Sequence, residues 1–583
     1  MTFLIKHLLT INLVITNFCG IIANDDLELL ILHTGCIHAR YEETFEPRTG
    51  KYYGGVDRLS YMVKKAREQR EAGEGPAVLY VDSGDIFSGS IWFFVHSYRG
   101  AAKIFNEIQP DAVNVGVHEF DAKMEGLTKF SELINFPIIS TNINFHNETE
   151  LEKKIKPAII KVIDGVKVAI LGYIIPEWIL YAEKGGIEFL DVIPLLNKEC
   201  RRLRFEEDVK VIIALSQGTI DTDRLIAHGV DYINVIIGTG SAAFLWNGVP
   251  PDLETPVDSY PVKVTRRDGS LVLIVHAYQY LKYMGKLQVR FTKDGKIRAF
   301  FGTPILMDSS ISQDPKMTKL IEELRHDVIS YDQKVLTTCS VLLEGSSCNH
   351  QECNFGNLVM DAIVEYRASQ YQGPGWTDAA VALMNSGSIT TDINSPQHED
   401  QIFYGDIIRA LPYSEMLYMV EIKGSDLLFI LEISTVGLEP TNTAQFLLTA
   451  GLKVMFDFNS RFGKRVKLIK VRCAECDVPE YFPLDLKKRY KVIITNYLLR
   501  GRSGYTIIRD VVWNPISIGE RDTNVIIKYL EKVKYVIPEV GGRLIPYDKR
   551  FNGNRQHSFG SRFNFDCYCF LLMLSSFVTL ITK

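Results

Sequence analysis

The chain has 583 residues, of which 46% are hydrophobic and 23% charged, and it carries a net charge of −5 at pH 7. This length is too great for one domain and predicts two to four. The negative charge argues against a nucleic-acid partner, and the short basic cluster Lys487–Arg489 is typical of a solvated face.

The first 23 residues are predicted to form a signal peptide. Lys6 precedes the apolar stretch Leu8–Ile22, and the small residue Ala23 offers a cleavage site. The acidic pair Asp25-Asp26 follows at once, which disfavours a buried N-terminal helix. We therefore expect export, with Asn24 as the first mature residue, and a location that is secreted or on the extracellular face of the plasma membrane.

Six continuous runs rich in Val, Ile and Leu alternate with helical stretches in the first half of the chain. Such runs are typical of strands buried on both faces in an α/β domain. Several end in short polar or glycine-rich clusters, at 34–36, 82–85, 116–118 and 238–240. Ligands gather at the carboxyl ends of strands in these folds, so we expect the clusters to converge. The runs are Leu27–His33, Ala77–Val81, Ala112–Val115, Val166–Leu171, Val209–Leu215 and Val235–Ile237.

A change of character near Asp314 predicts a boundary between two domains, 24–313 and 335–548. Asp314 suits the N-cap of a helix and Pro315 its first residue. Apolar residues follow at helical spacing, a stripe that by itself is typical of ordinary packing. We expect a linker helix over 314–334.

Two short cysteine spacings occur in the second half. Cys348 and Cys353 are five residues apart, and Cys473 and Cys476 form a Cys-x-x-Cys. A zinc ribbon also uses such spacing. In an oxidising compartment two local disulfides are the simpler interpretation.

Two further signals are typical of a cell-surface protein. The sequon Asn147–Thr149 predicts a glycosylated, exposed loop. In the tail, 549–583, the small residues Asn552–Asn554 and the polar spacer Arg555–Asp566 precede the apolar stretch Cys567–Thr582. This is the layout of a GPI-anchor signal. A marginal transmembrane tail and an unprocessed hydrophobic end stay open as alternatives.

The strand-end clusters, in this order, resemble those of the 5'-nucleotidase/apyrase family of secreted and GPI-anchored nucleotidases. The resemblance runs from Leu29 to about Ile545, and its two cysteine pairs match family disulfides. It implies an α/β fold, in which an N-terminal calcineurin-like metallophosphoesterase sandwich and a C-terminal α/β nucleotide-specificity domain are joined by a helix that permits rotation. The stretches that carry it are His33-Thr34 with His38-Ala39-Arg40, Asp82–Asp85, Gly116–Asp121 and Glu352–Asn357.

The resemblance also implies a dinuclear metal centre, most of whose ligands are replaced in this chain. The family's first metal takes an aspartate, a histidine, a bridging aspartate and an asparagine or glutamine. Its second metal takes the bridging aspartate, an asparagine and two histidines. The matching positions hold Cys36, His38, Asp85 and Ala242 for the first, and Asp85, Val117, Gln217 and Gly240 for the second.

We therefore expect no dinuclear site. One divalent metal, zinc, would use Cys36 as thiolate with His38 and Asp85, and the Gln217 carbonyl is a further candidate ligand. The alternative is that Cys36 is a small buried residue that fills the space of the aspartate.

The family's catalytic and nucleotide-binding positions are also altered. Its transition-state histidine and aspartate match His118 and Asp121, although without metals the interpretation of His118 as a hydrogen-bonded structural residue is favoured. Its base-stacking rings match Tyr413 and Tyr497, which are also typical of half-buried aromatic residues at a domain interface, and its asparagine matches Asn385. Its two arginines, the fork-shaped donors for phosphate, are replaced by Asn349 and Thr390, and its ribose-binding aspartate by Ser503.

We therefore expect a diverged secreted or GPI-anchored 5'-nucleotidase/apyrase homologue with weak or no phosphohydrolase activity, because loss of catalytic groups costs orders of magnitude in rate. The alternative is a non-catalytic nucleoside-binding or protein-binding (adhesion) protein on the same scaffold. The expected partners are a nucleoside or nucleotide, a membrane through the GPI anchor, and a second copy in a homodimer.

Overall fold

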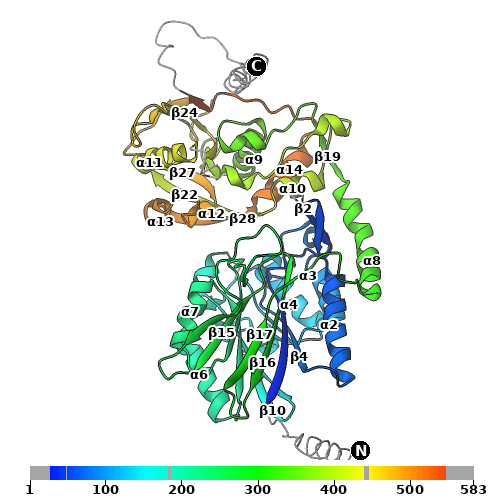
Figure 1. Cartoon of the computed structure of the whole chain (residues 1–583). Coiled ribbons are helices and arrows are strands. Elements are labelled where there is room, and N and C mark those ends of the chain that lie inside the picture. Colours follow the sequence, from blue (N-terminus) through cyan, green and yellow to red (C-terminus); the bar gives the residue numbers. More distant parts are fainter. Residues whose placement is uncertain (1–25, 47–48, 182–184, 439–444, 547–583) are drawn as a thin grey trace, which may run out of the picture.

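The computed structural model describes residues 26–46, 49–181, 185–438 and 445–546. The chain forms two α/β units, one at each end of the long helix α8 (Pro315–Asp332) (Figure 1). The predicted signal peptide and the whole of the predicted GPI-signal-like tail fall within residues 1–25 and 547–583, which lie outside the described residues.

One sheet of the N-terminal unit has the strand order β17-β16-β1-β4-β5-β6-β8, with β18 beside β16. Strand β1 is parallel to β4 and antiparallel to β16. The strands are β1 (Leu27–Thr34), β4 (Ala77–Asp82), β5 (Ala112–Asn114), β6 (Ile138–Ile139), β8 (Ile155–Lys156), β16 (Tyr283–Phe291), β17 (Ile297–Gly302) and β18 (Ile305–Leu306).

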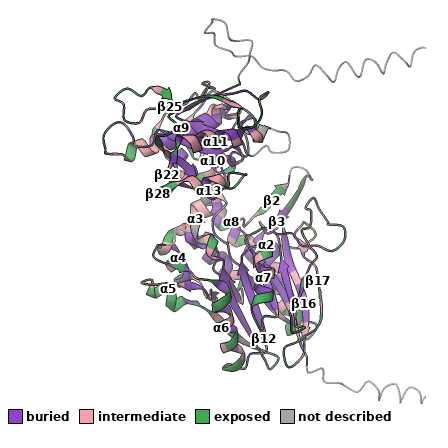
Figure 2. Ribbon diagram, turned by 90° about the vertical axis from the view of Figure 1, so that its left-hand side faces the viewer, coloured by how far each residue is buried: buried purple, intermediate pink, exposed green. Residues whose placement is uncertain are grey.

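The other sheet has the order β14-β15-β13-β12-β10-β9 and packs face to face on the first. Ile31 and Leu79 of the first sheet and Ile170 and Ile213 of the second lie in the core between them, at most 1% exposed. Figure 2 shows the strands largely buried. The strands are β9 (Ala158–Ile163), β10 (Val166–Ile174), β12 (Val211–Gln217), β13 (Val235–Thr239), β14 (Val262–Thr265) and β15 (Leu271–His276).

All six predicted apolar runs coincide with these strands, although β12 begins two residues after the start of its run and β5 ends one residue before the end of its run. Helices cover the outer faces of the sheets, α2, α3 and α4 on the first and α6 and α7 on the second. The helices are α2 (Val56–Glu71), α3 (Ile91–Ile108), α4 (Lys123–Leu133), α5 (Thr149–Lys154), α6 (Val192–Phe205) and α7 (Ile220–Gly229). Two small sheets pair β2 (Glu43–Glu46) with β3 (Lys51–Gly54) and β7 (Ile143–Asn144) with β11 (Glu188–Phe189).

Helix α8 begins where the sequence predicts a helix. The Asp314 carboxylate accepts the backbone N–H of Lys316 over 3.2 Å as an N-cap, and Pro315 is the first helical residue. Its apolar stripe packs on the N-terminal unit through Met317 and Ile321. Among the described residues, no helix combines the length and the apolar character that a membrane crossing requires.

The C-terminal unit contains sheets of order β23-β20-β27-β22-β28 and β26-β25-β24-β29, and a pair β19-β21. The two predicted disulfides, Cys348–Cys353 and Cys473–Cys476, are formed. The α/β character of both units confirms the predicted fold class. The strands are β19 (Val335–Thr338), β20 (Val381–Asn385), β21 (Gln401–Phe403), β22 (Met416–Lys423), β23 (Leu447–Ala450), β24 (Leu452–Phe456), β25 (Val466–Arg472), β26 (Tyr481–Pro483), β27 (Arg489–Thr495), β28 (Trp513–Arg521) and β29 (Leu544–Pro546), and the helices are α9 (Asn354–Gln370), α10 (Tyr404–Ala410), α11 (Gly424–Ser434), α12 (Asn496–Leu499), α13 (Ile507–Val511) and α14 (Asp522–Lys532).

Candidate functional site

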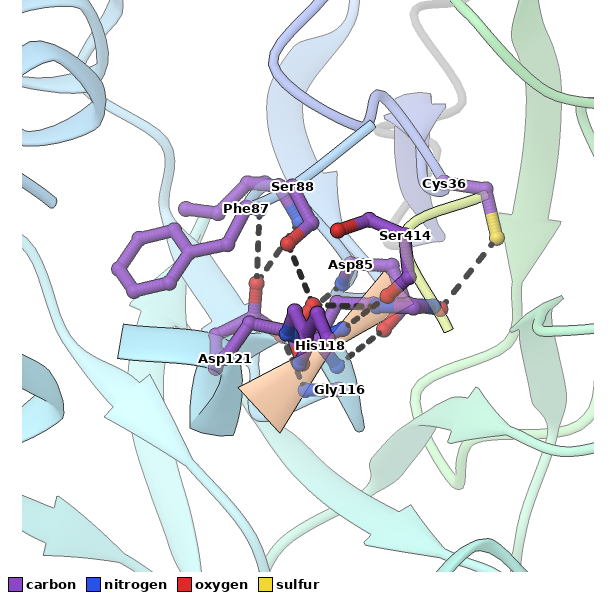
Figure 3. A network of polar contacts seen from close by, with 11 residues as sticks. Cys36, Asp85, Phe87, Ser88, Gly116, His118, Asp121 and Ser414 are labelled. Atoms are coloured by element: carbon purple, nitrogen blue, oxygen red, sulfur yellow. Dashed lines mark hydrogen bonds and ion pairs between the residues drawn. The ribbon is translucent and has the colours of Figure 1, made fainter. Parts of the chain in front are cut away.

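The strand ends of the N-terminal unit converge as the sequence predicts. Cys36 follows β1 and Asp85 follows β4, and Cys36 Sγ lies 3.5 Å from Asp85 Oδ2. The hydroxyl of Thr239, the last residue of β13, donates to Cys36 Sγ over 2.9 Å. Figure 3 shows Cys36 and Asp85 close to His118 and to Ser414 of the C-terminal unit. The site therefore lies where the two units meet.

Three of the candidate metal ligands lie together. The ligand atoms of Cys36, His38 and Asp85 are all within 4.8 Å of one another. Burial, and next the charge of Asp85, raises the pKa of the Cys36 thiol well above its usual value, although the Thr239 hydroxyl opposes this. Burial and His118 lower the pKa of His38 to about 4, so its imidazole is neutral at pH 7, the form that binds a metal.

The backbone of these loops has an unusual conformation for residues that carry a β-carbon. Cys36, His38 and Asp85 have φ of 50°, 54° and 61°, in the left-handed region. Backbone hydrogen bonds join the two loops, from Cys36 N–H to Gly84 O over 2.9 Å and from His38 N–H to Asp85 O over 3.0 Å. The main chain thus sets the direction of these side chains.

Glu119, whose role the sequence does not indicate, organises the same loops. Its buried carboxylate accepts four backbone N–H groups: Oε2 binds those of Asp85 (2.9 Å) and Gly116 (2.6 Å), and Oε1 those of Ile86 (2.8 Å) and Phe87 (3.3 Å). Burial and the nearby charge of Asp85 raise the pKa of Glu119 to about 8. The only sequence signal was its place between His118 and Phe120 in the motif.

Gln217, at the end of β12, lies against the loops that contain the remaining candidate positions. Its side chain is fully buried, and neither its Nε2 nor its Oε1 has a hydrogen-bond partner among the described residues. A β-carbon added to Gly116 would clash with Nε2, at 2.6 Å, and with Asp85 Oδ1, and one added to Gly240 would clash with Oε1. The amide therefore lies between these two glycines, and Val117 beside Gly116 is apolar and buried.

His118 and Asp121 form the predicted pair. His118 Nδ1 lies 2.8 Å from Asp121 Oδ2, and the backbone N–H of His118 donates to Asp85 Oδ1 over 3.0 Å. Burial lowers the pKa of His118, but the charges of Asp121 and Asp85 outweigh it and raise the pKa to about 9. Burial likewise opposes ionisation of Asp121, yet Arg521 and His118 hold the pKa of this carboxyl well below its usual range. At pH 7 the pair is an imidazolium and a carboxylate.

The predicted nucleoside residues of the C-terminal unit are less closely associated. Asn385, at the end of β20, is buried and accepts a hydrogen bond from Ser388 Oγ over 3.1 Å. The Tyr497 hydroxyl lies 3.2 Å from Ser503 Oγ, and Tyr413 is 56% exposed. In the described part of the chain, Asn385, Tyr413 and Tyr497 share no hydrogen bond or ring contact with one another.

Comparison with known proteins gives consistent results over most of the chain. Residues 335–510 match the family model described as 5'-nucleotidase, C-terminal domain. The 5'-nucleotidase of Homo sapiens is 34% identical over 528 residues, covering 89% of this chain and 90% of that protein. Protein 5NUC of Lutzomyia longipalpis is 34% identical over 534 residues, covering 89% and 92%. The apyrase of Tabanus yao is 31% identical over 522 residues, covering 88% and 92%.

A solved structure agrees with the sequence relatives. The crystal structure of a 5'-nucleotidase precursor from Thermus thermophilus matches with a TM-score of 0.64 and 25% identity, covering 90% of this chain and 100% of that chain. The likeness therefore includes both units. The chain belongs to the 5'-nucleotidase family.

Proposed function

We propose that this chain is a secreted member of the 5'-nucleotidase family that has lost most or all of the family's phosphohydrolase activity. The observation that carries the proposal is the environment of Asp85. On the side where a second metal would bind, Asp85 faces Gly116 and the buried amide of Gln217, and Gly240 offers no side chain. Hydrolysis by two metals needs both ions to activate the attacking water and to stabilise the developing charge.

The donors present fit one ion and do not fit two. Cys36, His38 and Asp85 would hold a single divalent ion, and a sulfur, nitrogen and oxygen set suits zinc. When bound, such an ion supplies a Lewis acid. A second ion would have only Asp85 and the Gln217 amide, because Val117 and Gly240 carry no ligand atom in their side chains. Of the family's catalytic groups, the chain would then retain the His118 and Asp121 pair.

The C-terminal unit lacks the charged phosphate donors that the resemblance implies, so we expect it to bind a phosphate only weakly. Thr390 and Asn349 replace the two arginines that the family resemblance implies, and the Thr390 hydroxyl donates to the backbone oxygen of Arg409 over 2.9 Å. No guanidinium therefore stands at either position. The exposed ring of Tyr413 favours the alternative function, nucleoside binding without hydrolysis.

The cellular context is part of the same proposal. We assign residues 24–313, 314–334 and 335–548 to the metallophosphoesterase-like domain, the linker and the substrate domain. Relatives that include a snake venom 5'-nucleotidase of Naja atra support secretion. Asn147 is exposed in a turn, as a glycosylated residue must be. GPI anchoring and a homodimer remain predictions from the sequence and the resemblance.

Metal analysis and turnover of the purified mature protein test this proposal. We expect at most one equivalent of zinc, and hydrolysis of AMP, ADP and ATP at background in zinc, magnesium or calcium. Asp85→Ala should remove the bound zinc, whereas the control Glu125→Ala, at an exposed position on α4, should retain it. Two equivalents of metal, together with turnover that Asp85→Ala abolishes, would contradict the proposal.

A further inference from the structure

An ion pair joins the two units at the candidate site. Arg521, the last residue of β28, donates from Nη2 to Asp121 Oδ1 over 2.5 Å and from Nη1 to the backbone oxygen of Ser414 over 2.6 Å. The side chain of Asp121 is 2% exposed and that of Arg521 15%. Because solvent is largely excluded, this pair is screened much less than a surface salt bridge.

Both partners are fixed within their own unit. Asp121 also accepts from Ser88 Oγ and lies 2.8 Å from His118 Nδ1, and both of these residues belong to the N-terminal unit. Arg521 pairs with Met416 in the sheet and is the N-cap residue of α14. The pair therefore connects one rigid element to another, and a rotation of either unit would pull the two charges apart.

A second, apolar contact lies at the linker helix. Phe94 of α3 packs against the core of the C-terminal unit, and its ring centroid is 6.3 Å from that of Tyr404 in α10. Tyr404 in turn lies 6.0 Å from Tyr331 near the end of α8. Apolar contacts of this kind tolerate small sliding motions, whereas the charge-assisted hydrogen bonds of Arg521 depend on a narrow range of distance and angle.

We propose that Arg521 is a latch that holds the two units closed on each other over the candidate site. While the pair is intact, the oxygens of Asp121 are engaged by Arg521, Ser88 and His118, so a ligand reaches this carboxylate only after the latch opens. The latch acts through the charge of a residue outside the candidate metal ligands. Asp121 also lies outside these ligands, so the latch does not require a bound metal.

Small-angle X-ray scattering of the full mature chain tests the latch. We expect a single compact form for the unaltered protein, and a larger radius of gyration with a broader distance distribution for Arg521→Gln and Asp121→Asn. Arg521→Lys retains the charge without the two-pronged geometry, so its radius of gyration should lie between those of the unaltered protein and of Arg521→Gln. The control is Arg367→Gln, which breaks a partly buried ion pair with Asp378 inside the C-terminal unit and should leave the radius unchanged.

Hydrogen exchange gives an independent measurement. In Arg521→Gln, protection of the amides of 118–122 and 414–416 should fall about tenfold or more, which corresponds to the loss of one charge-assisted hydrogen bond. Folded Arg521→Gln and Asp121→Asn proteins whose scattering and exchange match the unaltered chain would overturn the proposal. If these variants do not fold, hydrogen exchange of the unaltered protein still tests the latch. Amides of 118–122 that exchange as fast as those of an exposed loop would also overturn the proposal.

Discussion

Replacement of Glu119 by glutamine tests whether this carboxylate shapes the candidate site. Each oxygen of Glu119 accepts two backbone N–H groups, and glutamine would place an NH2 where one of the oxygens stands. Two buried N–H donors would then face a donor. An unsatisfied buried donor costs about 1–3 kcal/mol. Above pH 8, where Glu119 is ionised, removing its charge beside Asp85 offsets part of this, so we expect Glu119→Gln to lower the free energy of unfolding there by about 3 kcal/mol.

Urea unfolding of the full chain, followed by far-UV circular dichroism, measures this change. Glu125→Gln is the matched control, because Glu125 is exposed on α4 and should leave the free energy of unfolding unchanged. Glu119→Ala removes the acceptor from all four N–H groups and should be more destabilising than Glu119→Gln. A Glu119→Gln protein within about 1 kcal/mol of the unaltered chain would refute this account of the loops.

Three other substitutions have defined outcomes. Burial raises the pKa of Glu415 to about 7, so the contribution of this group to stability is complete below pH 4.5 and is lost as the pH rises through 7. Relative to Glu415→Gln, the unaltered protein should therefore lose about 2–3 kcal/mol of its free energy of unfolding between pH 5 and 8. A difference between the two proteins that stays constant with pH in urea unfolding would contradict this. Gly240 has a φ of 95° and a β-carbon there would clash with Gln217 Oε1, so Gly240→His should cost about 2–3 kcal/mol in thermal unfolding. Added Gln217→Ala should recover only part of this loss, and full recovery would show that backbone strain is absent. Tyr413→Ala removes an exposed ring, so it should leave the melting temperature unchanged and weaken adenosine binding about tenfold in calorimetry. The control Tyr52→Ala, also at an exposed ring, should change neither quantity. An unchanged adenosine affinity in Tyr413→Ala would count against nucleoside binding at this ring.

The elements of the N-terminal unit were predictable where local sequence dominates. The apolar runs coincide with strands because a strand buried on both faces excludes polar residues. Helix α8 begins at Pro315 because Asp314 and Pro315 satisfy the first turn locally. The two disulfides close short loops, and the short cysteine spacings together with the expected oxidising compartment predict them.

The candidate site was predictable only in part. The motif residues Cys36, His38 and Asp85 meet because parallel strands end at one edge of the sheet. The roles of Glu119 and Arg521 were missed, since backbone N–H groups leave no trace in a sequence and the partner of Arg521 lies 400 residues away. Nor could the sequence show that the Gln217 amide, without hydrogen-bond partners among the described residues, packs beside Gly240.

The left-handed backbone at Cys36, His38 and Asp85 has an evolutionary consequence. This conformation is held by main-chain hydrogen bonds between the two loops and by Glu119, so the positions still aim their side chains as ligands would be aimed. A single exchange of Cys36 for aspartate would then replace the thiol with a carboxylate ligand without rebuilding the loop. Gly240 differs, because Gln217 Oε1 obstructs any new side chain there. Under the proposed loss of the second metal, a ligand side chain at residue 240 would fit only once residue 217 had changed, so one buried amide would constrain the order of the two mutations.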